Sequence, residues 1–274
     1  YSGTMTDAAG GAAGLGAVDP GTVVIDADTP DISSVSGAAD DYGIGESVSI
    51  TVTFDETVIV TGTPSITLSN GETADYASGT GSNALVFTYT VVEGDTDATP
   101  LSVSSISGTI KDAADNGMST TISDGTLTGV NVDGNKPTVT ISSAQSLYTS
   151  STFDVSIAFN EAVTGLTLAD IGVTNGAGSL AGSGTTYTLT VTPTADGDVT
   201  ISIAGAVAND VAGNGNVAAS SITVESDQPD DPVIGSTAVT AVNEDALYSY
   251  SITATDADDG TPNSNTMAIT HTVT

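Results

Sequence analysis

Oxygen-bearing side chains recur with one spacing at three places along the chain. Residues 25–30, 132–137 and 224–229 each contain an aliphatic residue, an acid, a variable residue, Asp or Asn, another variable residue and Pro. The paired side chains are Asp26 with Asp28, Asp133 with Asn135, and Glu225 with Asp227. Such pairs suit a hard cation, because Ca²⁺ is bound by roughly 6 to 8 oxygen atoms in flexible geometry. The proline fixes its own φ and keeps the preceding residue extended, so we expect each segment to be a stiff joint between two domains.

Other acids should be brought to these joints by the strands of the domains that the joints connect. If the strands of a β-sandwich run alternately down and up, the second strand and the loop before the last strand both end at the pole where the chain enters. This arrangement predicts three oxygen-rich groups. The first contains Asp26, Asp28, Glu56, Asp112 and Asp115; the second contains Asp133, Asn135, Glu161, Asp210 and Asn214; the third contains Glu225, Asp227, Glu244, Asp256 and Asp258.

The types of side chain in these groups favour calcium. Carboxylates held this close without a counter-ion repel one another by about 1 to 4 kcal/mol per close pair near a surface, and a bound cation reverses that sign. Zn²⁺ would require His or Cys, and the chain has one His and no Cys. Mg²⁺ demands a strict octahedron and dehydrates reluctantly. For any single residue the alternative is structural, either a solvated acid that follows a strand or an Asp that closes an Asx-turn.

Alternating hydrophobic residues predict the strands that position these groups. Val48, Ile50, Val52 and Phe54 alternate with polar residues, and residues 85–91 do the same, which is the period of a strand with one buried face. The Ser-Asn-Gly sequence at 69–71 indicates a hairpin, and further short strands are expected at 66–68, 103–110 and 127–132. About seven short strands separated by turns predict an immunoglobulin-like (Ig-like) sandwich. The predicted fold class is all-β, with tandem Ig-like β-sandwiches in a linear array.

The same plan recurs along the chain and sets the expected domains. Phe153, Val155, Ile157 and Phe159 repeat the first alternating strand, and internal repetition of this kind indicates an array of domains. We expect the last loop and strand of a preceding repeat, or a donor strand, at 1–28, complete sandwiches at 29–135 and 136–226, and an incomplete domain at 227–274.

Composition excludes several classes of function. The 274 residues include 34 acids against 2 basic residues, for a formal charge of −32, so the chain is expected to repel nucleic acid and anionic lipid. No apolar stretch is long enough to span a membrane. We expect no enzymatic activity, because nucleophile-and-base chemistry needs a positioned His or Lys and the one His, His271, lies in the incomplete domain. Pairs of acids are too common in this chain to signal glycosidase chemistry. The Gly-rich residues 10–16 have no following helix or Lys and are interpreted as a loop.

At the joints and the acidic segments near them, the chain resembles the bacterial Ig-like repeats of large secreted adhesins. The resemblance covers about residues 1–226 and rests on Phe-x-Glu at 54–56, an Asp-Ala-Ala loop at 112–116, and the joint at 132–137. Residues 230–260 resemble the start of a cadherin-like domain, with Val-Asn-Glu-Asp and Thr-Asp-x-Asp segments where that family places calcium ligands. The resemblance implies an extracellular rod that is stiffened by calcium between its domains.

The second joint departs from the pattern. It has Asn135 where the other joints have Asp, and Lys136 adds a positive charge beside it. We therefore expect the second cation site to be weaker than the others, or empty.

The expected function is that of a structural and adhesive segment of a bacterial surface adhesin or fibre. Its expected partners are calcium, a cell-surface receptor, or copies of itself. Two alternatives stay open at this point. Residues 1–28 of one copy could complete residues 227–274 of the next by donating a strand, which would give a head-to-tail filament. The sandwiches could instead be non-catalytic modules of a secreted hydrolase, although the absence of Trp disfavours a sugar-binding surface.

Overall fold

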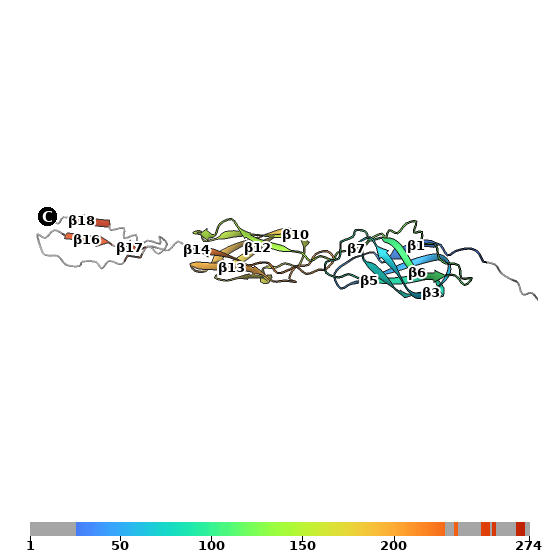
Figure 1. The fold of residues 1–274 in the computed structure, drawn as a ribbon. Coiled ribbons are helices and arrows are strands. Elements are labelled where there is room, and N and C mark those ends of the chain that lie inside the picture. The colour runs from blue at the N-terminus through green and yellow to red at the C-terminus, as the bar shows by residue number, and fades with distance from the viewer. Residues whose placement is uncertain (1–25, 228–232, 235–247, 253, 256–266, 272–274) are drawn as a thin grey trace, which may run out of the picture. The chain divides into compact units, whose positions relative to one another are not determined.

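The computed structural model describes residues 26–227 and several short strands beyond them (Figure 1). These strands are β15 (Val233–Ile234), β16 (Tyr248–Ile252), β17 (Ala254–Thr255) and β18 (Met267–His271). Apart from one short 3₁₀ helix, the regular elements of the described residues are all β-strands, so the all-β class expected from the sequence is confirmed. No helix in this part of the chain is long and apolar enough to cross a membrane.

The chain divides into two compact units, which are described separately. Within the continuously described segment, the first unit contains residues 26–38, 49–89 and 102–128, and the second contains 39–48, 90–101 and 129–227. The second unit therefore includes three short pieces that the sequence assigns to the first sandwich. The predicted domain boundaries at the joints stay a prediction.

One sheet forms most of the first unit. It is built from β1 (Ile32–Gly37), β3 (Ser47–Leu68), β4 (Thr73–Ser78), β5 (Ser82–Thr90) and β6 (Val103–Lys111). The long strand β3 changes partner along its length, because residues 50–54 pair with β1 and residues 59–68 pair with β6, both antiparallel. The alternating residues Val52, Phe54, Leu85 and Phe87 are almost fully buried, as their period of two predicts.

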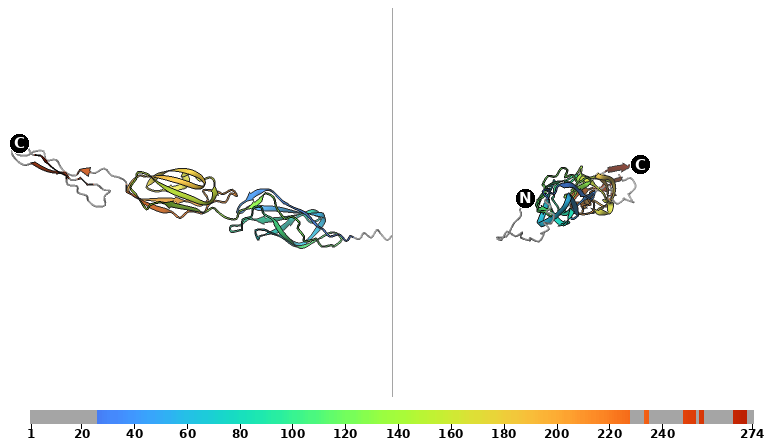
Figure 2. Two further views of the ribbon diagram at one scale, coloured as in Figure 1. Left: turned by 90° about the horizontal axis from the view of Figure 1, so that it is seen from above. Right: turned by 90° about the vertical axis from the view of Figure 1, so that its right-hand side faces the viewer.

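The second unit contains a two-layered sandwich (Figure 2). One sheet has the order β12 (Gly176–Pro193), β10 (Phe153–Val163), β8 (Val139–Ser143). The other has the order β11 (Ile171–Val173), β13 (Gly197–Ile203), β14 (Ile222–Ser226), β9 (Leu147–Tyr148), and the 3₁₀ helix η1 (Leu168–Asp170) precedes β11. Val155 and Ile157 of one sheet and Val199 and Ile201 of the other belong to a single buried cluster. Burial of these inward faces is the main force that holds the two sheets together.

A second element of this unit leads into the joint at 132–137. The short strand β2 (Asp40–Tyr42) pairs in parallel with β7 (Val130–Val132), and Leu101 N–H donates to Val130 O. The chain leaves β7 directly at Asp133. The start of the second joint is therefore anchored by a paired strand.

Several expectations fall outside the described residues. These are residues 1–25 of the loop and strand predicted at 1–28, and the predicted ligands Glu244, Asp256 and Asp258 of the cadherin-like segment. Strand exchange between copies depends on the same residues. It stays a prediction.

Candidate metal centre

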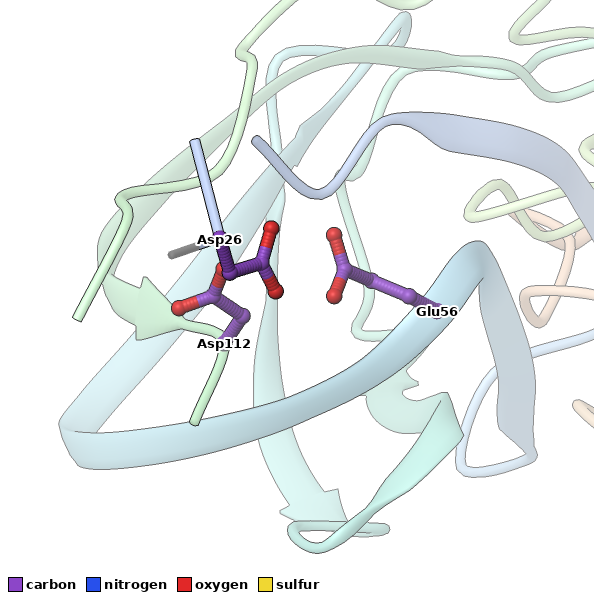
Figure 3. A group of neighbouring side chains, drawn as sticks. All are labelled: Asp26, Glu56 and Asp112. Atoms are coloured by element: carbon purple, nitrogen blue, oxygen red, sulfur yellow. The ribbon is translucent and has the colours of Figure 1, made fainter. Parts of the chain in front are cut away.

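The first joint lies beside a cluster of three carboxylates. Asp26, Glu56 and Asp112 each offer a carboxylate oxygen, and these three atoms lie within 4.8 Å of one another. Figure 3 shows the carboxyl groups of Asp26 and Glu56 facing each other, with that of Asp112 beside Asp26, and the three side chains come from three separate segments. The carboxyl groups that are brought together thus come from positions far apart in the sequence, as the down-and-up arrangement of strands predicts.

The position of Glu56 differs from the expected one. The sequence places it in a loop after a strand that ends at Phe54, whereas β3 continues to Leu68. Asp55 and Glu56 occupy the point where β3 passes from its pairing with β1 to its pairing with β6. The alternation of hydrophobic residues breaks at residues 55–57, where β3 changes partners, so the sequence pattern suggests an end although the strand continues. Glu56 is consequently held by paired strand on both sides.

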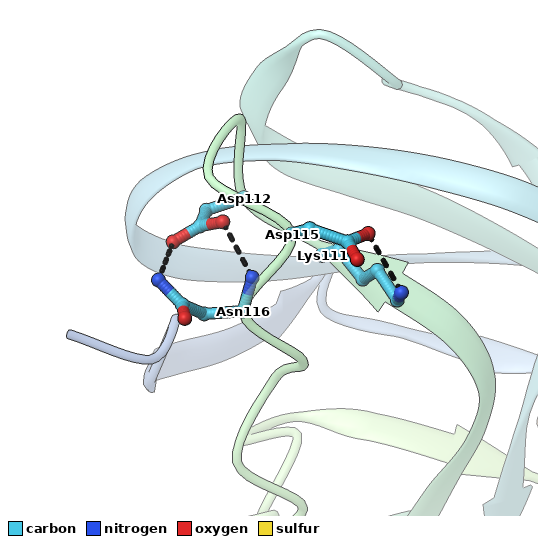
Figure 4. A network of polar contacts seen from close by, with 4 residues as sticks. All are labelled: Lys111, Asp112, Asp115 and Asn116. Carbon is cyan, nitrogen blue, oxygen red and sulfur yellow. Dashed lines mark hydrogen bonds and ion pairs between the residues drawn. The ribbon is translucent and has the colours of Figure 1, made fainter. Parts of the chain in front are cut away.

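The loop after β6 holds Asp112 in place. Asn116 N–H donates to Asp112 Oδ1 at 2.8 Å, and Asn116 Nδ2 donates to Asp112 Oδ2 at 2.7 Å and to the Asp26 carbonyl at 3.2 Å. Both oxygens of the buried Asp112 are therefore paired within the loop (Figure 4). Asp115 adopts a positive φ of 76° and accepts a hydrogen bond from Lys111 at 2.7 Å, so its carboxylate is engaged by that ion pair.

The second joint lies beside a corresponding cluster. Asp133, Glu161 and Asp210 offer oxygens that again lie within 4.8 Å of one another. Glu161 lies in β10, between Ala158 and Val163, where the register of pairing with β12 shifts. Asp210 begins a loop with the same turn as the loop at 112–116, and Asn214 N–H donates to Asp210 Oδ1 at 2.8 Å.

One atom of this second cluster has no hydrogen-bond partner. Asp210 is only 6% exposed, and its Oδ2 is the one buried side-chain oxygen or nitrogen among the described residues for which no partner is found. Burial of a charged oxygen without a partner is costly. A cation among Asp133, Glu161 and Asp210 would satisfy it. The arrangement therefore fits a bound metal.

Asp97 is a fourth acid at the second cluster, and the pattern of joints did not predict it. Asp97 Oδ1 accepts hydrogen bonds from Gly134 N–H at 3.1 Å and from Asn135 Nδ2 at 2.8 Å, and so fixes the joint directly after Asp133. A signal was present in the sequence, because acids alternate at positions 93, 95 and 97 as they do at the joints.

A cavity of about 160 Å³ opens beside this cluster. Its lining residues are Asp41, Asp97, Thr99, Asn131, Val132, Asp133, Val211 and Ala212. A space of this size accommodates the water molecules that commonly complete the coordination shell of Ca²⁺.

The clusters raise the pKa of several of their carboxyl groups. Burial and the charges of Asp133 and Asp210 raise the pKa of Glu161, and burial together with the charge of Asp97 raises the pKa of Asp133. Desolvation and the charges of Asp112 and Asp26 raise the pKa of Glu56. The pKa of Asp112 moves the other way, because burial, which would raise it, is outweighed by hydrogen bonds from Asn116 and from the backbone of Ala114 and Asp115 together. Most of these groups therefore resist ionisation when no cation is present.

The raised pKa values predict that the melting temperature depends on pH in opposite directions in chelator and in Ca²⁺. In the folded chain, the pKa values of Glu161 and Glu56 lie above their ordinary value of 4.5, and that of Asp133 lies above 3.8. Between the ordinary and the raised pKa values, the folded chain therefore binds more protons than the unfolded chain. In chelator, we expect the melting temperature to rise when the pH falls from 7 to 5. In saturating Ca²⁺ it should fall over the same range, because protons compete for the ligands. Calorimetric melting curves at the two pH values check this, and a fall in chelator would contradict it.

Other ligands predicted from the sequence do not belong to either cluster of three carboxylates. Asp28 N–H donates to Asp26 Oδ1 at 3.2 Å, so Asp28 helps to close the turn of the first joint. Asn135 N–H likewise donates to Asp133 Oδ1. Glu225 lies in β14 and Asp227 directly follows it, and the third group cannot be assembled because its other members lie outside the described residues.

Comparisons with known proteins find a family match for part of the chain. No curated protein matches it. Extracellular domains 3–5 of Drosophila OTK are similar over 85% of this chain and 77% of that one, with 9% identity and a TM-score of 0.23, on which no conclusion rests. Residues 133–226 match the family model described as a bacterial Ig-like domain, which is a non-catalytic type of domain. The expected class of Ig-like β-sandwiches is thus confirmed, and the residues that match the family model begin at Asp133, the acid of the second joint.

Proposed function

We propose that this chain is a non-enzymatic structural segment of an extracellular bacterial adhesin or fibre, in which Ca²⁺ stiffens the acidic joints between Ig-like repeats. The observation that carries this proposal is the buried, unpartnered Oδ2 of Asp210 in a cluster with Asp133 and Glu161. A purely structural acid in such a position would be expected to have a hydrogen-bond donor. The bacterial Ig-like match supports the type of repeat.

The donor sets favour Ca²⁺ over other metals. Every side chain in the two clusters is a carboxylate, which suits hard cations and gives Zn²⁺ neither the nitrogen nor the sulfur that it prefers. Ca²⁺ accommodates the irregular geometry that results when ligands come from a joint, a strand and a loop. Asp133, Glu161 and Asp210 would hold the ion at the second joint, and Asp26, Glu56 and Asp112 at the first.

The contacts of the second joint favour the opposite order of affinities from the one expected from the sequence. Lys136 Nζ donates to Glu93 at 2.6 Å, so its charge is paired with an acid that is not part of the cluster. The amide of Asn135 donates to Asp97. Neither of the two departures from the pattern thus opposes a cation. We propose that the second site binds Ca²⁺ more tightly than the first, where Asn116 already pairs both oxygens of Asp112.

A cation at either cluster would restrict the joint, because it would bond the joint, the strand and the loop directly to one another. At the first joint, Asp26 is linked to the loop at 112–116 by the 3.2 Å contact from Asn116. A divalent ion adds direct bonds from the joint to β3 and to that loop. Without it, like charges push the same segments apart.

Distances between spin labels test this proposal. The chain has no Cys, so Cys can be introduced at two exposed strand positions, Ser78 and Thr188, and labelled without background. We expect a narrower distribution of distances in Ca²⁺ than in chelator. A pair within one sandwich, Ser78 with Thr53, is the matched control and should not change. Equal widths for the first pair in the two conditions would defeat the proposal.

A further inference from the structure

The two loops that carry Asp112 and Asp210 have the same turn but use their asparagines differently. In each, the Asn backbone N–H donates to Oδ1 of the Asp four residues before it, at 2.8 Å. Asn116 Nδ2 then donates to the other oxygen of Asp112. Asn214 Nδ2 donates instead to the Asp133 carbonyl at 3.1 Å, and Asp210 Oδ2 is left without a partner.

A turn from the first predicted sandwich accounts for the different position of Asn214. Asn214 Oδ1 accepts a hydrogen bond of 2.7 Å from the N–H of Ile44, a residue 170 positions away. Ile44 and Asn214 belong to the same compact unit. Asn116 Nδ2 donates to the joint carbonyl and to Asp112 at the same time, so the bond to Asp133 alone does not prevent a cap. The bond from Ile44 N–H fixes the rotation of the Asn214 carboxamide, and in this rotation Nδ2 reaches the Asp133 carbonyl and not Asp210 Oδ2.

The contact at Ile44 depends on close approach of the two backbones. Gly43 is buried, and a Cβ at this position would lie 2.3 Å from the carbonyl oxygen of Ala212 and 2.8 Å from Asn214 Oδ1. Any side chain at position 43 must therefore push the turn away from the loop that carries Asp210. Gly43 has no positive φ, so closeness alone explains the requirement for glycine here.

We infer that Asn214 couples docking of the turn at 43–44 to cation binding at the second joint: when this turn is docked, it holds the Asn214 carboxamide and leaves Asp210 Oδ2 free for the cation. When the turn is displaced, Asn214 caps Asp210 as Asn116 caps Asp112, and the cap competes with the cation. This inference rests on the proposed function. By reciprocity, a cation at the second joint favours the docked turn by the same factor.

A Gly43→Ala variant of the full chain tests the coupling, because it alters no carboxylate. The matched control is Gly117→Ala, since Gly117 has an ordinary φ and a Cβ there would meet nothing within 4 Å. Both are titrated with CaCl₂ in a Glu56→Gln background, which weakens the first cluster. Because the Asn214 cap would be a hydrogen bond to a charged oxygen, we expect Gly43→Ala to lower Ca²⁺ affinity by about tenfold or more. The control should lower it by less than about twofold.

A second variant separates capping from general damage to the fold. Asn214→Ala added to Gly43→Ala removes the competing carboxamide, so part of the lost affinity should return. Hydrogen exchange gives a local readout, in which Ca²⁺ should slow exchange of the Ile44 amide in the parent chain and not in Gly43→Ala.

The outcomes distinguish the two proposals. If the parent chain takes up no Ca²⁺, the proposed function fails. If it binds Ca²⁺ with the same affinity in Gly43→Ala as in Gly117→Ala, the coupling is overturned and the cation site stands. If affinity falls in Gly43→Ala but does not recover when Asn214 is removed, the cap is not the cause and the inference is likewise overturned.

Discussion

An Asp210→Asn substitution should stabilise the chain in chelator and destabilise it in Ca²⁺. The new amide keeps an oxygen in place to accept from Asn214 N–H, and it replaces the unpartnered Oδ2 with a donor that lies among the carboxylates of Asp133 and Glu161. A buried polar group without a partner costs about 1 to 3 kcal/mol, so we expect the free energy of unfolding in chelator to rise by about that amount. In Ca²⁺ the loss of one charged ligand should lower affinity by tenfold or more.

This opposite response separates a metal ligand from a structural acid. A structural acid would lose stability in both conditions when it is replaced. The matched control is Asp198→Asn, which removes the same charge from an exposed position in β13 and should leave melting unchanged in both conditions. Denaturant unfolding with and without Ca²⁺ measures all four values. A loss of stability for Asp210→Asn in chelator would contradict the assignment of Asp210.

Removal of calcium should lower the melting temperature of the chain strongly. A ligand that binds only the folded state contributes about 2.7 kcal/mol when its free concentration is 100 times its dissociation constant. For a domain of this size, about 1 kcal/mol corresponds to 4 to 8 °C, so the expected loss on adding chelator is about 10 to 20 °C. The physical reason is that chelation leaves each cluster with three adjacent carboxylates and no counter-charge.

Salt controls identify this effect as specific. NaCl at matched ionic strength screens the overall charge of −32 and should recover only a small part of the lost stability. MgCl₂ should recover less than CaCl₂ does, because of its stricter geometry. Scanning calorimetry makes the comparison. Equal recovery with all three salts would show that the effect is screening alone.

Local patterns in the sequence are sufficient to predict the strands and the general location of the two carboxylate clusters. Alternation at Val52 and Phe54, and again at Val155 and Ile157, correctly predicts buried strand faces, because burial follows the period of two directly. The recurrence of the joints, combined with alternating strand directions, places Glu56 and Asp112 near Asp26.

The properties that distinguish the two clusters could not be read from the sequence, because they depend on contacts between distant residues. Lys136 seemed placed to weaken the second site, yet its partner is Glu93, 43 residues earlier. Asp97 reaches the joint across 37 residues, and Asn214 reaches Ile44 across 170. The rotation of a single carboxamide decides whether Asp210 Oδ2 is capped. No local pattern encodes that rotation.

Counting the calcium ions bound per chain shows whether the two carboxylate clusters are cation sites. Equilibrium dialysis with ⁴⁵Ca²⁺ on the full chain is compared with the double variant Glu56→Gln/Asp210→Asn, so that any site beyond the described residues contributes equally to both. The account predicts that the variant binds two fewer ions than the parent chain at the concentration that saturates the parent. Equal uptake by the two proteins, or no uptake by either, would contradict it.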